Sequence, residues 1–167
     1  MRSIAGLLPG LVLALGACAS DAGGSVGPPQ ATIGTGAVEF QPLADGDTVY
    51  VVLGPQGGFH IWGAVRVANL DAGNADDLSD PSNPTTVFHV YAGGQQVDAD
   101  AAHYVQGLDP VGDGTFEMVG RAVILDITSD TQLDGMEIRF TVDVTAVDGT
   151  QASDERMLIA RPDPNNS

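Results

Sequence analysis

The sequence contains no lysine and only one cysteine. Of its 167 residues, 22 are acidic and 6 are basic, all of them arginine, so the formal net charge is −16 at pH 7. A side-chain surface that binds nucleic acid or anionic lipid has to be basic, and this composition argues against both. A lone cysteine cannot form a disulfide within the chain, so the fold must rest on its core. The acidic excess predicts a soluble, self-repelling surface.

Aromatic residues and long apolar runs are also scarce. The chain has one tryptophan, three tyrosines and five phenylalanines. Its N-terminal apolar stretch, residues 4–17, is shorter than the roughly 20 residues that a membrane-spanning helix needs. That stretch follows the positive charge of Arg2, which is the form of a secretory signal. We therefore expect residues 1–17 to be a cleaved signal peptide.

The apolar stretch ends in Leu15-Gly16-Ala17-Cys18, which resembles the lipobox of bacterial lipoproteins. The resemblance implies cleavage before Cys18, a diacylglyceryl thioether on that cysteine and an N-acyl chain such as palmitate. Several acyl chains anchor a protein stably where one would be marginal, so the membrane is an expected partner. Ala19, in place of aspartate, is similar to the outer-membrane class of these lipoproteins. The resemblance places the protein in the cell envelope, at the outer rather than the inner membrane.

The rest of the chain divides by composition. Residues 18–35 are rich in glycine, serine, proline and alanine, which predicts a flexible, lipidated tether. Residues 36–161 carry the apolar periodicity of a folded domain. Residues 162–167 predict a disordered tail.

Within the domain, runs rich in valine, threonine and isoleucine alternate with turn residues. This pattern is typical of an all-β protein, and we expect a single antiparallel β-sandwich of about seven strands. Gly120 lies inside one run and predicts a β-bulge. The expected strands span residues 37–41, 48–53, 59–70, 86–91 with a continuation over 95–97, 115–127, 136–147 and 150–160.

The last two expected strands have the clearest pattern. Apolar and polar residues alternate strictly over 136–146, which indicates a strand with one wet face. Asp148-Gly149 then supplies a two-residue hairpin turn. The segment FTVDVTAVDGTQASDERMLIA resembles the closing hairpin of immunoglobulin-like and fibronectin type III-like domains. That resemblance implies a Greek-key sandwich, although the chain lacks the Cys–Trp–Cys pattern of true immunoglobulin domains.

The stretch GPQGGFHIW, residues 54–62, crowds three glycines, a histidine and the only tryptophan together. Its first five residues predict a turn, because proline presets the first turn position and a following glycine takes the left-handed conformation. In the strand that follows, the residues on one face are apolar, which predicts that this face packs in the core. The other face carries His60, Trp62 and Arg66. This row either faces water or leaves Trp62 buried against a loop with its N–H bonded.

Tryptophan and arginine are enriched at binding hot spots, so the row is a candidate interaction face. In a fibronectin-like strand order, the 59–70 strand neighbours the last two strands, which bring further arginines to it. A protein or glycan partner is expected there; ordinary cross-strand salt bridges with Glu137 and Asp143 are the alternative interpretation. The predicted face consists of His60, Trp62, Arg66, Arg139 and Arg156.

Other site chemistries have less support. His60, His89 and His103 do not share a metal-ligand spacing, and the acidic loop 71–80 lacks the order of an EF-hand. The only cysteine is assigned to lipid and no G-x-S-x-G occurs. We therefore predict no metal site, no cofactor and no catalysis. A calcium- or copper-binding lipoprotein and an enzyme of unknown class remain alternatives to a lipid-anchored envelope protein with a binding or structural role.

Overall fold

A computed structural model describes residues 27–99 and 102–166, and nearly all of its regular structure is strand. The one helical element, η1, is a single 3-10 turn capped by Ser129. The expected all-β class is confirmed. In chain order the elements are β1 (Gln30–Thr35), β2 (Gln41–Pro42), β3 (Thr48–Leu53), β4 (Phe59–Ala68), β5 (Thr85–Ala92), β6 (Gln95–Gln96), β7 (Ala102–Val105), β8 (Asp109–Gly112), β9 (Thr115–Leu125), η1 (Asp130–Gln132), β10 (Glu137–Thr145) and β11 (Gln151–Pro162).

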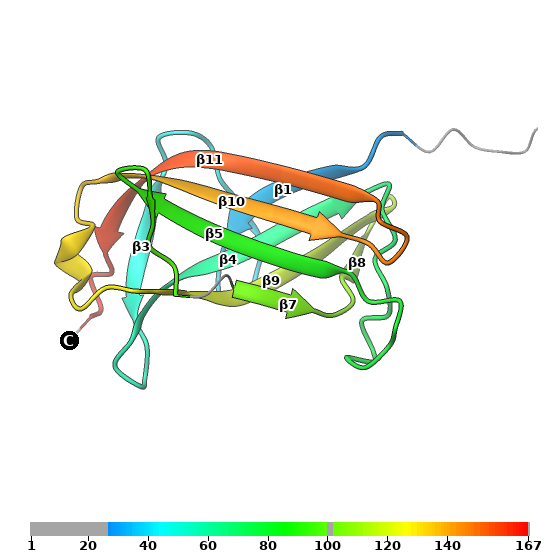
Figure 1. The fold of residues 1–167 in the computed structure, drawn as a ribbon, viewed down its shortest axis with the longest axis horizontal. Helices are drawn as coiled ribbons and strands as arrows, with labels where there is room; N and C mark the ends of the chain where they lie inside the picture. The colour runs from blue at the N-terminus through cyan, green and yellow to red at the C-terminus, as the bar shows by residue number, and fades with distance from the viewer. Residues whose placement is uncertain (1–26, 100–101, 167) are drawn as a thin grey trace, which may run out of the picture.

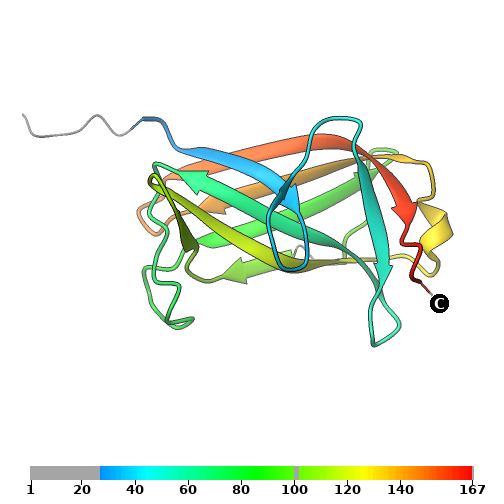
Figure 2. The ribbon, with the colours of Figure 1, turned by 180° about the vertical axis from the view of Figure 1, so that it is seen from behind.

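The strands form two layers that face each other as a β-sandwich. In one layer β4 pairs with β9 along its length and with β1 at its C-terminal half, while β2 and β8 extend the edges. In the other layer β10 lies between β11 and β5, and β5 also pairs with β6 and β7. Figure 1 shows the β11–β10–β5 layer in front, and Figure 2 shows the β1–β4–β9 layer from behind. β3 joins the layers, antiparallel to β4 and parallel to β11.

The core fills the space between the layers. On β10 the side chains of Ile138, Phe140, Val142 and Val144 are fully buried, which confirms the predicted alternation. Phe140 stacks on Phe88 of β5 with ring centroids 5.7 Å apart. Burying each of these large apolar side chains stabilises the fold by about 1.5–3 kcal/mol.

The predicted bulge is confirmed at Gly120. The pairing of β4 with β9 shifts register between Gly63 and Val65, opposite the segment that holds Gly120. Gly120 has φ +71°, and a Cβ at this position would lie 2.4 Å from the carbonyl oxygen of Ala37. Only glycine fits both the left-handed conformation and that close approach.

The domain is longer at both ends than its composition predicts. Residues 30–35, assigned to the tether, form β1, and Ile33 within it is fully buried. The strand expected at 37–41 is instead a loop followed by the short β2. At the other end β11 runs to Pro162, and Asn166 is tied down: its side chain donates to the carbonyl of Val51 and accepts from the backbone N–H of Leu53. The described part of the predicted tail is therefore packed on β3.

The strand order departs from the fibronectin-like order that we expected. β4 pairs with β1, β3 and β9 and with neither β10 nor β11, so it lies in the layer opposite them. The prediction that β4 neighbours the last two strands is wrong. An apolar alternation fixes which face of a strand is buried, but it carries no information about the sheet to which the strand belongs.

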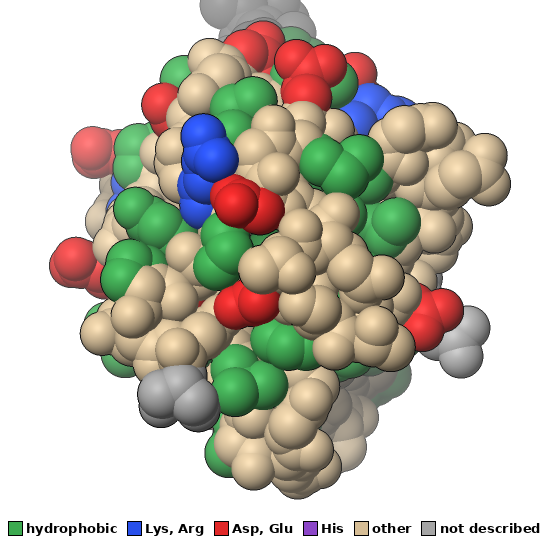
Figure 3. All heavy atoms as spheres, turned by 90° about the vertical axis from the view of Figure 1, so that its left-hand side faces the viewer, with side chains coloured by type: hydrophobic (Ala, Val, Ile, Leu, Met, Phe, Trp, Pro, Cys, Tyr) green, Lys and Arg blue, Asp and Glu red, His purple; other side chains and the backbone are tan. Residues whose placement is uncertain are grey.

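Residues 1–26, with the predicted signal peptide, Cys18 and half of the predicted tether, lie outside the described residues. Within residues 27–99 and 102–166, no helix has the length and apolar character to cross a membrane. At the end of the molecule on the left of Figure 1, hydrophobic side chains are scattered in small groups among charged and polar ones (Figure 3).

Candidate functional site

The first five residues of GPQGGFHIW form the turn between β3 and β4, as the sequence predicts. The backbone N–H of Gly54 donates to the carbonyl of Gly58 at 2.7 Å, and that of Gly57 donates to the carbonyl of Gly54 at 2.9 Å. Gly57 has φ +84°, the left-handed conformation that this turn requires. The turn is therefore explained by local backbone chemistry, and no ligand is needed to account for its glycines.

Beside this turn lies a hollow of about 550 Å³ on the outer face of β4 and β9. We call it the loop hollow. Among the described residues, no charged side chain lines it, although the chain carries 22 acidic residues. A volume in this range with an apolar lining and a few polar groups is typical of a small-ligand pocket. The loop hollow is lined by Gly54, Pro55, Gln56, Gly58, His60, Trp62, Ala122 and Ile124.

His60 is the titratable group of the loop hollow. It is only 5 % exposed, and its Nε2 atom is buried without a hydrogen-bond partner in the described structure. Burial lowers the pKa of His60 below its usual value, so the ring is neutral at pH 7. The ring packs edge to face against Trp62, with centroids 4.5 Å apart and an angle of 82° between the planes. His60 thus supports the indole from beneath the turn.

Trp62 separates the loop hollow from a second, smaller hollow of about 230 Å³, which we call the strand hollow. The indole is partly buried, between the two arrangements expected from the sequence. The carbonyl of Trp62 accepts a hydrogen bond from the Thr35 hydroxyl at 2.8 Å, which fixes the backbone here. The strand hollow is lined by Thr35, Gly36, Ala37, Gln41, Thr48, Val49, Tyr50, Val52, Trp62 and Asp163.

The remaining residues of the predicted interaction face do not gather around Trp62. Arg66 is exposed on the same layer, where its guanidinium lies over the Phe40 ring at 4.3 Å and its Nε donates to Glu117 at 2.8 Å. Arg139 and Arg156 belong to β10 and β11 in the opposite layer. The prediction of one continuous face is wrong because it depended on the fibronectin-like strand order.

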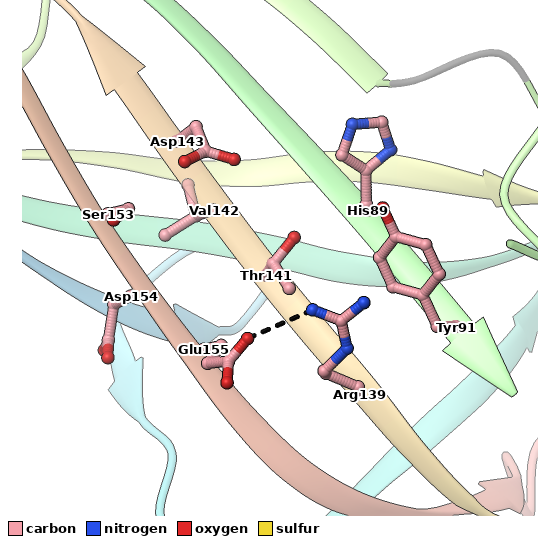
Figure 4. Close-up of a pocket in the computed structure, with 9 residues that line it drawn as sticks. All are labelled: His89, Tyr91, Arg139, Thr141, Val142, Asp143, Ser153, Asp154 and Glu155. Carbon is pink, nitrogen blue, oxygen red and sulfur yellow. Dashed lines mark hydrogen bonds and ion pairs between the residues drawn. The ribbon is translucent and has the colours of Figure 1, made fainter. Parts of the chain in front are cut away.

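Arg139 instead contributes to a polar groove of about 440 Å³ on the outer face of β5, β10 and β11 (Figure 4). Its guanidinium lies over the Tyr91 ring at 4.1 Å, and its Nη1 lies 3.2 Å from a carboxylate oxygen of Glu155. These contacts already satisfy the Arg139 charge. This is a cross-strand salt bridge of the kind that the alternative interpretation predicted, but its acidic partner is Glu155 rather than Glu137 or Asp143.

Arg156 is also engaged within the fold. Its Nε donates to the carbonyl of Leu43 at 3.0 Å, and its Nη1 pairs with the carboxylate of Asp154. The same carboxylate accepts the backbone N–H of Ile33 at 2.8 Å. Arg156 and Asp154 therefore connect β11 to β1 and to the loop before β3.

The residues considered for metal binding are dispersed. His89 is bound through Nδ1 to the buried carboxylate of Asp98 at 3.1 Å, whereas His60 lies in the opposite layer. In the acidic loop, hydrogen bonds from Ser79 lower the pKa of Asp77. Hydrogen bonds from Ser82 and then Asn74 lower the pKa of Asp80. Among the described residues, no group of three or more histidine, cysteine, aspartate or glutamate side chains is arranged to hold a metal ion.

Sequence reasoning found Trp62 and His60 but not the rest of the loop hollow. Ala122 pairs directly with Trp62, and Ile124 with His60, so β9 supplies one wall. The sequence indicates which side chains of β9 share a face, but it does not indicate which strand β9 pairs with. The outward position of Ile124, which is 46 % exposed, is the one signal that could have pointed to this wall.

No protein-family model matches the chain. No curated protein matches it either. Among solved structures, Spo0M, a sporulation control protein from Bacillus subtilis, is similar over 83 % of this chain and 51 % of that one, at 11 % identity and TM-score 0.39. The chain thus spans about half the length of that protein. The CooA pilin subunit of enterotoxigenic Escherichia coli is similar over 80 % of this chain and 99 % of that one, at 10 % identity and TM-score 0.32.

Proposed function

We propose that the protein is a lipid-anchored component of the bacterial cell envelope, whose β-sandwich binds an envelope partner through the loop hollow and Trp62. The lipobox-like Leu15-Gly16-Ala17-Cys18 supports the anchor. The outer-membrane class implied by Ala19 is part of the same proposal. The domain begins at β1, only a short segment after Cys18, so the lipid holds the domain close to the membrane.

The observation that carries the binding role is the loop hollow itself. In a chain with a net charge of −16, a hollow without charged lining that exposes the only tryptophan is not needed for solubility. Tryptophan in a pocket is a recurrent anchor of recognition, because it supplies a large contact area and an N–H donor. The chemistry around it contains no activated nucleophile and no acid–base pair, which favours binding over catalysis.

The anchor is tested by metabolic labelling of producing cells with a palmitate analogue. Wild-type protein takes up the label, because the modified cysteine carries acyl chains. The Cys18→Ala variant does not take up the label. Equal labelling of the two proteins contradicts the lipid assignment.

The binding role is tested by placing a photo-crosslinking amino acid at position 124, on the wall of the loop hollow. The matched control carries it at position 147, where Val147 is 62 % exposed and lies at the β10–β11 turn. Irradiation of intact cells is expected to give a discrete adduct from position 124 only. The adduct is lost when Trp62→Ala is added. Equal adducts from both positions, or no adduct from position 124, contradict binding at the loop hollow.

A further inference from the structure

Trp62 is a shared wall of two hollows. It lines both the loop hollow of about 550 Å³ and the strand hollow of about 230 Å³. We call the two together the Trp62 groove. A ligand that fills both hollows has to pass Trp62, so the groove suits an extended molecule with one part on either side of a central contact.

The lining of the groove combines an aromatic ring with uncharged hydrogen-bonding groups. Gln56 and His60 line the loop hollow, and Thr48 and Tyr50 line the strand hollow. Asp163 is the one acidic residue along the groove. The indole N–H of Trp62 donates to no residue of the described structure, and it is not among the buried atoms that lack a partner. It is therefore available as a donor.

Most of the β4 backbone beneath the groove is already paired. β4 bonds to β9 on one edge, and on the other edge to β3 at residues 59–60 and to β1 at residues 64–68. An extended peptide that joins a sheet needs an open strand edge, and the edge of β4 opposite β9 lacks a strand partner only at residues 61–63, where the Trp62 carbonyl already accepts from the Thr35 hydroxyl. Recognition in the Trp62 groove must therefore come from side chains acting on the face of the ligand.

From this combination we propose that the Trp62 groove binds an uncharged linear glycan, with one sugar ring against the Trp62 indole and its neighbours in the two hollows. The inference rests on the proposed binding function and names its ligand class. A pyranose ring has an apolar face of C–H groups and a rim of hydroxyls, which matches an aromatic wall flanked by hydroxyl and amide groups. The net charge of −16 disfavours a polyanionic chain.

The test is titration of the purified full-length protein with neutral hexasaccharides, following the fluorescence of its only tryptophan. The panel contains cellohexaose, N-acetylchitohexaose, maltohexaose and mannohexaose, with the corresponding monosaccharides and a hexauronate as comparisons. At least one neutral hexasaccharide is expected to shift the Trp62 emission saturably. It should bind about tenfold or more tightly than its monosaccharide, because both hollows contribute. The hexauronate should bind more weakly.

Two variants test whether the fluorescence change comes from hexasaccharide binding in the Trp62 groove. Calorimetry should show loss of hexasaccharide binding in Trp62→Ala, and at least a several-fold weakening in Tyr50→Ala, which removes the ring that lines the strand hollow. Arg139→Ala, in the polar groove of the opposite layer, should bind as the wild type does. No emission change with any neutral hexasaccharide, equal binding of monosaccharide and hexasaccharide, or preference for the hexauronate overturns the glycan assignment. If position 124 gives a Trp62-dependent crosslinked adduct but no hexasaccharide of the panel binds, the proposed binding function is retained and only the assignment of a glycan ligand is rejected.

Discussion

Within the described part of the chain, His60 is a buried histidine with an unpartnered ring nitrogen, in a surface hollow that no charged side chain lines. A charged imidazolium there would lose its hydration and gain no counter-ion. Burial therefore lowers the pKa of His60 and keeps the ring neutral. The neutral ring can pack against Trp62 as an aromatic neighbour, which keeps the indole at the boundary between the two hollows.

This burial makes stability depend on pH. The folded-state pKa of His60 lies below its usual value of about 6.5, so the unfolded chain binds more protons in the window between the two. Stability contributed by neutral His60 is present above pH 6.5 and is lost as the pH falls through that window. In thermal unfolding between pH 7.5 and pH 5, the wild type should lose more stability than His60→Phe, which keeps a ring but cannot titrate. His103→Gln, at an exposed position on β7, should follow the wild type; the same slope in wild type and His60→Phe would refute the assignment.

Which side chains of β4 are buried was predictable at most positions. Ile61, Val65 and Val67 are buried as expected, because apolar residues two apart on a strand share a face. The burial of His60 was not predictable. It arises when the β3–β4 turn and Trp62 cover an outward-facing residue, and that depends on tertiary contacts rather than on alternation.

At the scale of elements, β1 is a strand in a segment whose composition predicts a flexible tether. Glycine and proline surround it, yet it pairs with β4 over residues 30–34 and buries Ile33 completely. Its second edge is held by the Asp154 carboxylate, which accepts the Ile33 N–H. β1 therefore belongs to the core, and Thr35 at its end bonds the carbonyl of Trp62.

The stability of the domain should accordingly depend on β1. Ile33→Ala removes a fully buried side chain and is expected to cost about 2–5 kcal/mol in chemical denaturation. The matched control is Val38→Ala in the following loop, where the side chain is 93 % exposed and the cost should be within about 0.5 kcal/mol. If Ile33→Ala were as mild as Val38→Ala, residues 30–35 would be the tether that the composition predicts.

Elements with strong periodicity were predictable and their partners were not. β10 alternates strictly and was placed correctly, as was the bulge at Gly120. The turn after β10 was located correctly, but it holds three residues, 147–149, rather than the predicted two. The order of strands depends on contacts between residues far apart in the chain. The β3–β4 hairpin therefore separated Arg139 and Arg156 from Trp62 even though each strand was correctly recognised.

At the scale of the molecule, charge and binding surface are separated. The formal charge of −16 keeps the surface hydrated, and four of the five domain arginines, 66, 139, 156 and 161, are paired with acidic residues. The Trp62 groove stands apart as a nearly uncharged depression on the outer face of one layer.

The fluorescence of the single tryptophan tests most directly whether the groove is open. Partly buried Trp62 should emit between the wavelengths of buried and fully exposed indole, and acrylamide should quench it measurably in the folded protein. A hexasaccharide that occupies the groove should reduce this quenching. Blue-shifted emission that acrylamide does not quench would show that Trp62 is closed off from solvent, and would contradict a binding site at the groove.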